Sequence, residues 1–233
     1  MEITFLGTGA GATSGSSRFK SSFLLRDQGV GLLFDMGAGS NLRLEDMNLV
    51  SSFQALFITH THLDHFNGLP DHLVYRKITS MPKLRVLSPR GLGGVLSAMK
   101  TVGNDIEAEL EESNLPKLSL DRMQVWSVEG CHSIYSVAYV VDNGNRRVLY
   151  SGDTAEPCEP ILRVAKEVDV VVHEASCLED CSRWGHTSAS QALRHFAEKR
   201  LVLTHVPSQL ASQIEQYVGG KAIIARDGLT IKI

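Results

Sequence analysis

The sequence has no long apolar run, little net charge and only four cysteines among its 233 residues. No stretch approaches the ~20 apolar residues of a membrane-spanning helix, so we expect no membrane partner. The N-terminus, MEITFLGTG, lacks the basic start and long apolar stretch of a signal peptide, which favours a cytoplasmic protein. A formal net charge of −3 argues against a surface coated with basic residues for nucleic acid, although it leaves room for a local basic patch.

The four cysteines are too few to form a disulfide framework in a chain of this length. They are Cys131, Cys158, Cys177 and Cys181. The last two form a CxxxC pair that could bind a metal or form a disulfide, but this spacing is weakly specific. In a cytoplasmic compartment the favoured interpretation is four reduced thiols.

The composition, 43% hydrophobic and 21% charged, is typical of one soluble domain, which we place at residues 1–233. Short apolar strands dominate the first part of the chain and alternate with helices later, which predicts two sheets with helices outside them. The expected strands are Ile3–Leu6, Ser22–Arg26, Gly31–Phe34, Gln54–Thr59, Leu84–Leu87, Gln124–Val128, Ser136–Val141, Arg147–Tyr150, Val168–Val172, Leu201–Thr204 and short runs near Ile223 and at Thr230–Ile233. The expected helices are Gly68–Ile78, Leu92–Glu112, Glu159–Glu167, Ser188–Lys199 and Ser208–Val218.

The most informative segment is HTHLDH, which contains His60, His62, Asp64 and His65 and follows the apolar run Phe53–Thr59. Imidazoles and carboxylates suit a packed core poorly and suit zinc and similar ions well. Residues i and i+2 of an extended segment share a face, so the first two histidines can converge on one ion. The aspartate and third histidine lie past the bend and could reach a second ion. A chance cluster of surface histidines is the alternative interpretation.

Further candidate ligands follow other expected strands. They are Asp35, His132, Asp153, His173, Glu174 and His205. Ligand sites in layered α/β proteins favour strand ends, where loops project from a rigid scaffold. Each residue alone is a weak signal, and the collective pattern predicts a shared site.

HTHLDH followed by His132, Asp153 and His205 resembles the metallo-β-lactamase superfamily, along nearly the whole chain. The resemblance implies an α/β fold, a four-layered αββα sandwich, with a two-metal site at one edge. It implies that one ion is held by His60, His62 and His132, that the other is held by Asp64, His65 and His205, and that Asp153 bridges both. It also implies that Asp35 buttresses the HTHLDH loop without being a ligand.

The segments VVHEAS and GHTSASQA resemble the motifs of tRNase Z, the endonuclease that trims tRNA 3′ trailers. FLGTGAG and DHFNGLPDHL resemble that group as well. The resemblance implies that His186 protonates the leaving alkoxide, that Glu174 orients His186, and that the ligand Asp64 also belongs to the catalytic residues. The alternative is that Glu174 caps a turn and His186 caps the helix that starts near Ser188.

Two segments depart from the tRNase Z pattern. The protruding arm that grips tRNA is missing, since Arg90–Leu120 is short, acidic and expected to be mostly helical, and the loop Ala12–Arg18 is unlike its counterpart. Contacts with tRNA would then depend on a few basic residues, which are equally compatible with solvated surface charges: Arg18, Lys20, Arg76, Lys77 and Arg90. The GxGxxA motif at Gly7–Ala12 could also indicate dinucleotide binding, but no helical pattern follows, which favours a tight turn.

We therefore expect a phosphodiesterase with two divalent ions, zinc, or alternatively manganese or iron. The leading hypothesis is a tRNase Z-like endoribonuclease that cuts 3′-extended tRNA with a metal-bridging hydroxide. The alternatives are a phosphodiesterase for small nucleotides or other small phosphodiesters, a metallo-hydrolase of thioesters or lactones, and a metal-dependent redox or binding protein. Because tRNase Z relatives form dimers, we expect a homodimer by analogy.

Overall fold

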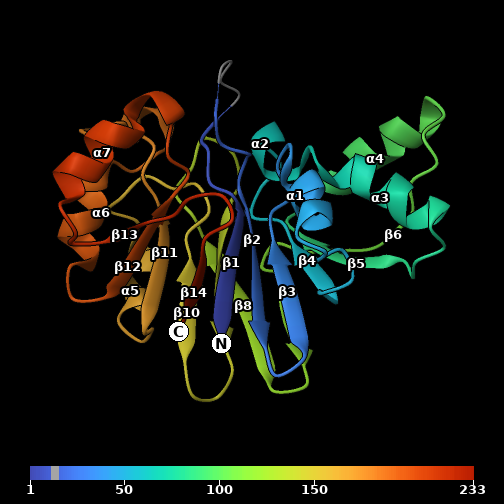
Figure 1. Cartoon of the computed structure of the whole chain (residues 1–233), viewed down its shortest axis with the longest axis horizontal. Coiled ribbons are helices and arrows are strands. Elements are labelled where there is room, and N and C mark those ends of the chain that lie inside the picture. Colours follow the sequence, from blue (N-terminus) through green and yellow to red (C-terminus); the bar gives the residue numbers. More distant parts are fainter. Residues whose placement is uncertain (12–15) are drawn as a thin grey trace.

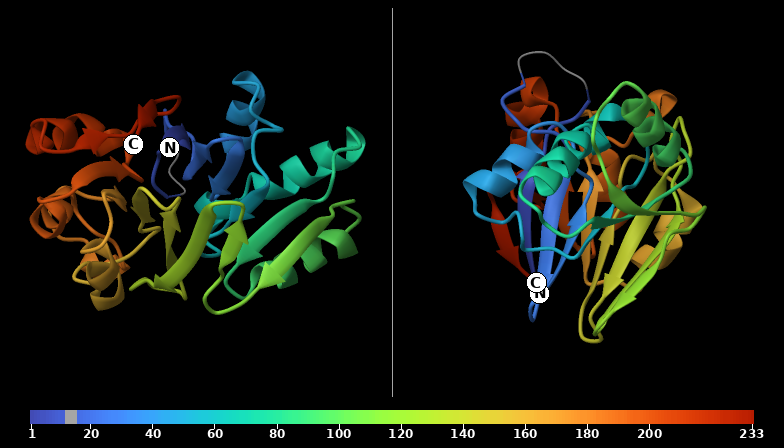
Figure 2. Two further views of the ribbon diagram at one scale, coloured as in Figure 1. Left: turned by 90° about the horizontal axis from the view of Figure 1, so that it is seen from below. Right: turned by 90° about the vertical axis from the view of Figure 1, so that its right-hand side faces the viewer.

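The computed structural model describes residues 1–11 and 16–233. Two seven-stranded sheets pack face to face, and helices cover the outer face of each sheet (Figure 1; Figure 2). The predicted αββα architecture is therefore confirmed. The two termini lie side by side at one end of the sheets (Figure 1), because the first and last strands pair with each other.

The first sheet has an antiparallel and a parallel half. In spatial order its strands are β14 (Thr230–Lys232), β1 (Glu2–Gly7), β2 (Ser22–Asp27), β3 (Val30–Phe34), β4 (Ala55–Phe57), β5 (Leu84–Ser88) and β6 (Ala108–Glu112). Pairing is antiparallel from β14 to β3 and parallel from β3 to β6.

The second sheet repeats this plan in the other half of the chain. In spatial order its strands are β13 (Ile223–Ile224), β12 (Arg200–Thr204), β11 (Val170–Glu174), β10 (Arg147–Tyr150), β9 (Val137–Asp142), β8 (Met123–Glu129) and β7 (Leu118–Leu120). Pairing is parallel from β13 to β10 and antiparallel from β10 to β7.

The helices divide between the outer faces of the two sheets (Figure 1). Beside the first sheet lie α1 (Ser40–Asp46), α2 (Leu63–Phe66), α3 (Leu69–Ile78) and α4 (Leu92–Thr101). Beside the second lie α5 (Glu159–Ala165), α6 (Ala189–Phe196) and α7 (Ala211–Val218), with short 3₁₀ turns η1 (Ser182–Trp184) and η2 (Ser208–Leu210). In the described part of the chain, no helix has the length and apolar composition needed to cross a membrane.

Alternation along the strands builds the core between the sheets. Successive side chains of a strand point to opposite faces, so Phe34 faces the second sheet while Leu33 faces the helices. Phe34 stacks between Phe23 and Phe57, with ring centroids 5.0 and 5.1 Å away. Burial of such apolar surface fixes the register of each strand, since a slip by one residue would turn these rings toward the helices.

The helix predicted at Leu92–Glu112 is wrong in its second half. The helix ends at Thr101, where Gly103 adopts a positive φ of 98°, and residues Ala108–Glu112 form the edge strand β6. Parallel pairing with β5 decides the structure of this acidic segment, because its own propensity for strand is low. The helix α1 and the strand β7 were not predicted.

The prediction of four reduced thiols is also wrong. The structure contains disulfides between Cys131 and Cys158, with Cα atoms 5.7 Å apart, and between Cys177 and Cys181, with Cα atoms 6.3 Å apart. Cys131 follows β8 and Cys158 precedes α5, and the packing of α5 beside β8 brings them together. Such a pairing across 27 positions depends on the tertiary structure and cannot be read from spacing.

Candidate metal centre

The loops after β4, β8, β10, β11 and β12 bring the predicted ligands to one place. Their ligand atoms form overlapping groups in which all atoms lie within 4.8 Å of one another. The residues that the structure brings together in this way are His60, His62, Asp64, His65, His132, Asp153, Glu174, His186 and His205. Asp153 belongs to every group. The chance-cluster interpretation of HTHLDH therefore does not fit the structure.

The first group is formed by three imidazoles and Asp153. His62 Nδ1 lies 3.2 Å from His60 Nε2 and 3.0 Å from His132 Nε2. Asp153 Oδ2 lies 3.6 Å from His60 Nε2 and 4.0 Å from His132 Nε2. Ligands of a tetrahedral zinc ion at about 2.0–2.1 Å lie about 3.3–3.4 Å apart. The spacing of these four atoms therefore fits one metal ion.

The second group combines two carboxylates with two imidazoles. Asp64 Oδ2 lies 3.0 Å from His205 Nε2, and Asp153 Oδ1 lies 3.2 Å from His65 Nε2. His65 Nε2 and Asp153 Oδ1 are buried and have no hydrogen-bond partner among the described residues. Buried polar atoms are almost always satisfied, so two such orphans facing each other fit a metal ion between them. With Asp153 shared, the donor set fits a binuclear metal centre.

The second ring nitrogen of four histidines is fixed by the protein. His60, His65, His132 and His205 direct Nε2 into the groups, and their Nδ1 atoms lie 2.6–3.0 Å from, respectively, Thr59 Oγ1, Asp35 Oδ2, the Gly185 carbonyl and Ser176 Oγ. Such partners set the tautomer and the orientation of a metal-binding imidazole. Each ring thus directs Nε2 toward its group and has a hydrogen-bond partner behind it at Nδ1.

Asp35 lies behind the centre and is completely buried. It accepts hydrogen bonds from the Thr59 backbone at 2.8 Å, from the Thr59 hydroxyl, from His65 Nδ1 at 2.7 Å and from the Tyr150 hydroxyl at 2.8 Å. Asp35 thereby connects β3, the HTHLDH loop and β10. This geometry agrees with the buttressing role implied by the resemblance.

Glu174 and His186 form a hydrogen-bonded pair beside the ligands. His186 Nδ1 donates to Glu174 Oε2 at 3.0 Å and lies 3.9 Å from Asp153 Oδ2. Burial alone would lower the pKa of His186, but the hydrogen bond and charge of Glu174, helped by Asp153, raise it to about 9. The helix α6 is capped by Ser188, which accepts from the Gln191 backbone at 3.1 Å, so the interpretation of His186 as its cap is wrong.

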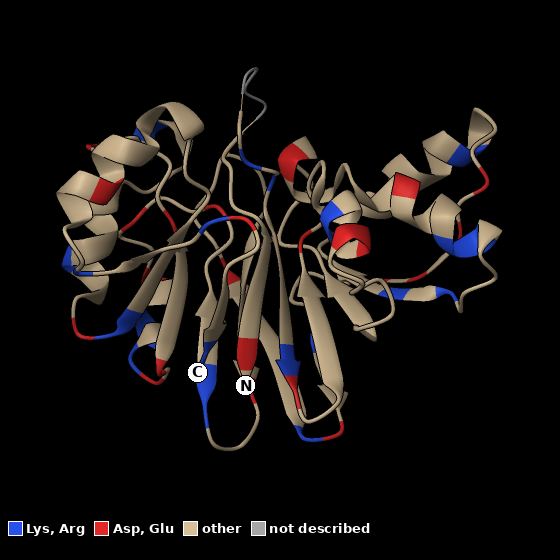
Figure 3. Ribbon diagram, viewed as in Figure 1, with Lys and Arg blue, Asp and Glu red and all other residues tan. Residues whose placement is uncertain are grey.

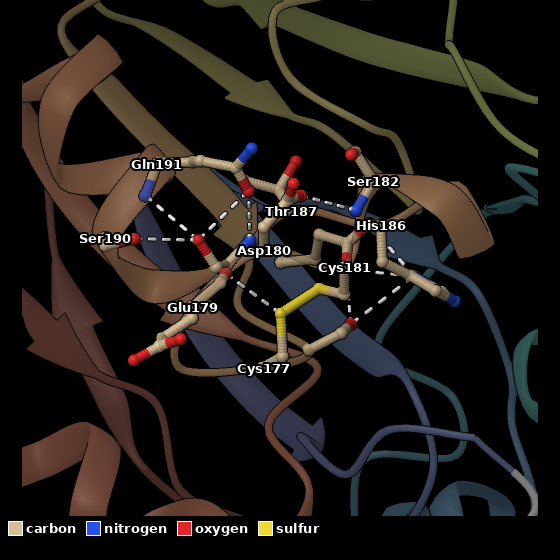
Figure 4. The surroundings of a disulfide bond; sticks show 12 residues. Cys177, Glu179, Asp180, Cys181, Ser182, His186, Thr187, Ser190 and Gln191 are labelled. Atoms are coloured by element: carbon tan, nitrogen blue, oxygen red, sulfur yellow. Dashed lines mark hydrogen bonds and ion pairs between the residues drawn. A yellow bond between two sulfur atoms is a disulfide. The ribbon is translucent and has the colours of Figure 1, made fainter.

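The second disulfide lies in the segment between β11 and His186 (Figure 4). Cys177 and Cys181 join its first residues, and Asp180 accepts from the Ser182 backbone at 2.9 Å. Gly185 adopts a positive φ of 79°, and a Cβ there would lie 2.8 Å from Nδ1 of His132. A glycine is therefore required where this loop meets the ligand.

Ser176 was not among the residues that the sequence motifs indicated. Its hydroxyl hydrogen bonds to Glu174 Oε2, lies 2.7 Å from His205 Nδ1 and lies 3.4 Å from His186 Nδ1. The available signal was its position two residues after Glu174, since residues i and i+2 of an extended segment share a face.

The glycine-rich segment forms a turn at the rim of the centre. The Gly11 backbone donates to Asp64 Oδ2 at 2.8 Å, and Lys20 Nζ donates to the Ala10 carbonyl at 3.0 Å. Residues 16–21 form no helix before β2 begins, so the helix that a dinucleotide motif requires is not found there. Residues 12–15 of the atypical loop Ala12–Arg18 lie outside the described residues.

Several of the basic residues considered for RNA contacts are engaged within the protein. Arg18 donates to the Thr8 hydroxyl and the Ala225 carbonyl, and Arg76 donates to the Pro82 carbonyl. Lys77 forms ion pairs with acidic residues of the 105–107 segment. In the view of Figure 3, acidic and basic residues are interspersed along the ribbon without a broad basic stripe.

The whole chain is similar to known proteins. The model of the family described as anti-Pycsar protein Apyc1 matches residues 1–226. Ribonuclease Z of Halobacterium salinarum is 28% identical over 302 aligned positions, which cover 100% of this chain and 97% of that protein. Because the alignment is longer than this 233-residue chain, the relative contains segments without a counterpart here.

Solved structures share the architecture. Human tRNase Z, short form, has a TM-score of 0.83 and 24% identity, with 100% of this chain and 99% of that chain covered. A metallo-β-lactamase fold protein of Bacillus subtilis has a TM-score of 0.81 and 17% identity, with 99% of this chain and 98% of that chain covered. These likenesses identify the two-sheet architecture as the metallo-β-lactamase fold.

Proposed function

Because the chain belongs to the family described as anti-Pycsar protein Apyc1, we propose that it is a metal-dependent phosphodiesterase that hydrolyses cyclic nucleotides. The chain is a metallo-β-lactamase-fold hydrolase related to ribonuclease Z, as its motifs predicted. The sequence alone favoured 3′-extended tRNA as the substrate, with small nucleotides as the alternative. The family match favours that alternative.

The proposal depends on one observation above all: the hydrogen-bonded pair Glu174–His186 lies directly beside the ligand groups. In the proposed assignment, His60, His62 and His132 hold one ion, Asp64, His65 and His205 hold the other, and Asp153 bridges them. His186 stands 3.9 Å from Asp153, and the hydrogen bond and charge of Glu174 outweigh burial and raise the pKa of this imidazole to about 9. Two divalent ions, when bound, supply Lewis acidity at the phosphate and lower the pKa of water.

In the proposed hydrolysis, the oxygen of a water molecule forms a new bond to phosphorus, the ring P–O bond breaks, and the departing ribose oxygen needs a proton. His186 donates that proton, and Glu174 holds the imidazole in place and stabilises its charged form. Glu174 is itself fixed, since Oε1 accepts from the Thr154 backbone at 2.6 Å. Asp64 orients the second ligand group through its contact with His205.

The edge of the first sheet offers little to a long RNA. The segment where a tRNA-gripping arm was expected, Arg90–Leu120, contains the acidic edge strand β6, and Glu111 of this strand and Glu107 just before it pair with neighbouring basic residues. Lys83 pairs with Glu107 at 2.9 Å, for example. Phosphate contacts dominate nucleic-acid affinity, so an acidic, internally paired edge disfavours a long RNA here.

A tRNase Z-like endoribonuclease is the second candidate function. It is favoured by the full-length similarity to ribonuclease Z and by the HEAS and GHTS segments that contribute Glu174 and His186. Both functions break a phosphodiester with the same residues, so the substrate distinguishes them.

The proposal is tested by offering both substrate classes to the metal-loaded protein. We expect purine and pyrimidine 3′,5′-cyclic nucleotides to be hydrolysed and a 3′-extended precursor tRNA to remain intact. His186→Ala is expected to keep its metal and lose about 10²–10⁴-fold in turnover. His195→Ala, an imidazole of α6 outside the ligand groups, is the matched control with full activity. A cut near the tRNA 3′ end with no cyclic-nucleotide hydrolysis would replace this proposal with the second candidate.

A further inference from the structure

Ser176 connects the ligand groups with the Glu174–His186 pair. It follows β11, and its backbone N–H donates to the Thr187 carbonyl at 3.0 Å, which ties it to the segment that carries His186. Its hydroxyl hydrogen bonds to Glu174 Oε2 on one side and lies 2.7 Å from His205 Nδ1 on the other. One hydroxyl therefore contacts a carboxylate and a predicted ligand at once.

The direction of each hydrogen bond follows from the donors present. His205 Nε2 lies 3.0 Å from Asp64 Oδ2 within the second ligand group. If Nε2 binds a metal, the ring proton is on Nδ1 and is donated to Ser176 Oγ. The single hydroxyl hydrogen of Ser176 is then donated to Glu174 Oε2, which also accepts from His186 Nδ1 at 3.0 Å. The hydrogen bonds of the four groups therefore converge on the Glu174 carboxylate, from His205 through Ser176 on one side and from His186 on the other.

We propose that Ser176 is a positioning residue that couples His205 to the Glu174–His186 pair. It fixes the His205 ring as an Nε2 ligand and sets the orientation of the Glu174 carboxylate. The backbone of His205 has a positive φ of 51°, a region that non-glycine residues rarely adopt, so local preference alone does not place this ring. The expected effect of Ser176 on catalysis rests on the proposed function, whereas its expected effect on metal binding does not.

The test compares Ser176→Ala, Ser176→Thr and Ser133→Ala. Ser176→Ala leaves the His205 Nδ1–H without its acceptor, and we expect the affinity for the second ion to fall about 10–100-fold while the first ion binds as in the wild type. Ser176→Thr retains a hydroxyl and should restore most of this loss. Ser133→Ala changes an exposed serine next to the predicted ligand His132 and should have no effect.

A second readout follows the imidazole directly. The Nδ1–H proton of His205 should give a low-field, exchange-protected NMR signal in the zinc-loaded protein, and Ser176→Ala should abolish the protection. At saturating metal, Ser176→Ala should lower kcat and leave KM unchanged. Equal metal affinity in all three variants, or a protected signal in Ser176→Ala, would overturn the coupling. If Ser176→Ala loses the second ion but the wild type hydrolyses no cyclic nucleotide, the coupling stands and the proposed function is rejected.

Discussion

The hydrogen bonds of the buried Asp35 carboxylate allow a quantitative test of how the HTHLDH loop is anchored. Tyr150 donates its hydroxyl to Asp35 Oδ2 at 2.8 Å, and both residues are almost completely buried. Tyr150→Phe removes the hydroxyl and keeps the ring, so its packing against Phe23 and Phe34 remains. Because a hydrogen bond to a charged group contributes about 1.5–3 kcal/mol, we expect the free energy of unfolding to fall by about 2 kcal/mol.

Tyr139 provides a matched control on the neighbouring strand β9. It is also buried, and its hydroxyl donates at 2.8 Å to the neutral carbonyl of Ile58. A hydrogen bond between neutral groups contributes about 1 kcal/mol, so Tyr139→Phe should cost roughly half as much. The difference between the two variants isolates the charge on Asp35.

Urea unfolding of the metal-free proteins is the appropriate assay, because bound ions would stabilise the folded state by mass action. The two variants should unfold with similar m-values and different midpoints. If Tyr150→Phe costs no more than Tyr139→Phe, Asp35 is not an ionised acceptor, and the account of it as the anchor of His65 is wrong.

Three further predictions concern the bridging ligand, a disulfide and a buried histidine. Asp153→Ala should bind at most one ion per chain by elemental analysis, because Asp153 belongs to both ligand groups, and full occupancy would refute the bridging role. Replacing Cys131 and Cys158 with Ser should lower the free energy of unfolding by about 3.5 kcal/mol from loop closure, measured in urea, whereas an unchanged midpoint would contradict a disulfide contribution. Burial, followed by the charge of Arg76, lowers the pKa of His72 to about 4 in the folded protein. As the pH falls from 6.5 to 4, His72 therefore takes up a proton in the unfolded protein before it does so in the folded protein. Stability should therefore decline by about 3 kcal/mol across that window, and His72→Phe should remove this decline in a pH series of urea melts.

The sequence was sufficient to predict the fold and to select the residues that the structure gathers. HTHLDH predicts the first ligand pair correctly because residues i and i+2 of an extended segment lie on the same side, which brings His60 and His62 together. This alternation is a local property of the chain. The proximity of ligands that follow parallel strands could also be predicted, since such strands end at the same edge of a sheet.

The features that the sequence did not predict depend on neighbours distant in the chain. The strand β6 exists because β5 offers a free edge to pair with, and its own residues favour strand weakly. The Cys131–Cys158 disulfide exists because α5 packs beside β8. Ser176 has a role only when Glu174 and His205 meet around it, and no local pattern encodes that meeting.

The most direct test of the account is a metal titration of the metal-free protein, with the rate of cyclic-nucleotide hydrolysis as the readout. We predict that the rate rises with added zinc and reaches its plateau at two equivalents per chain, because Asp153 joins two ligand groups into one centre. Hydrolysis that saturates at one equivalent would contradict the binuclear centre. No hydrolysis of any 3′,5′-cyclic nucleotide at full occupancy would contradict the proposed function.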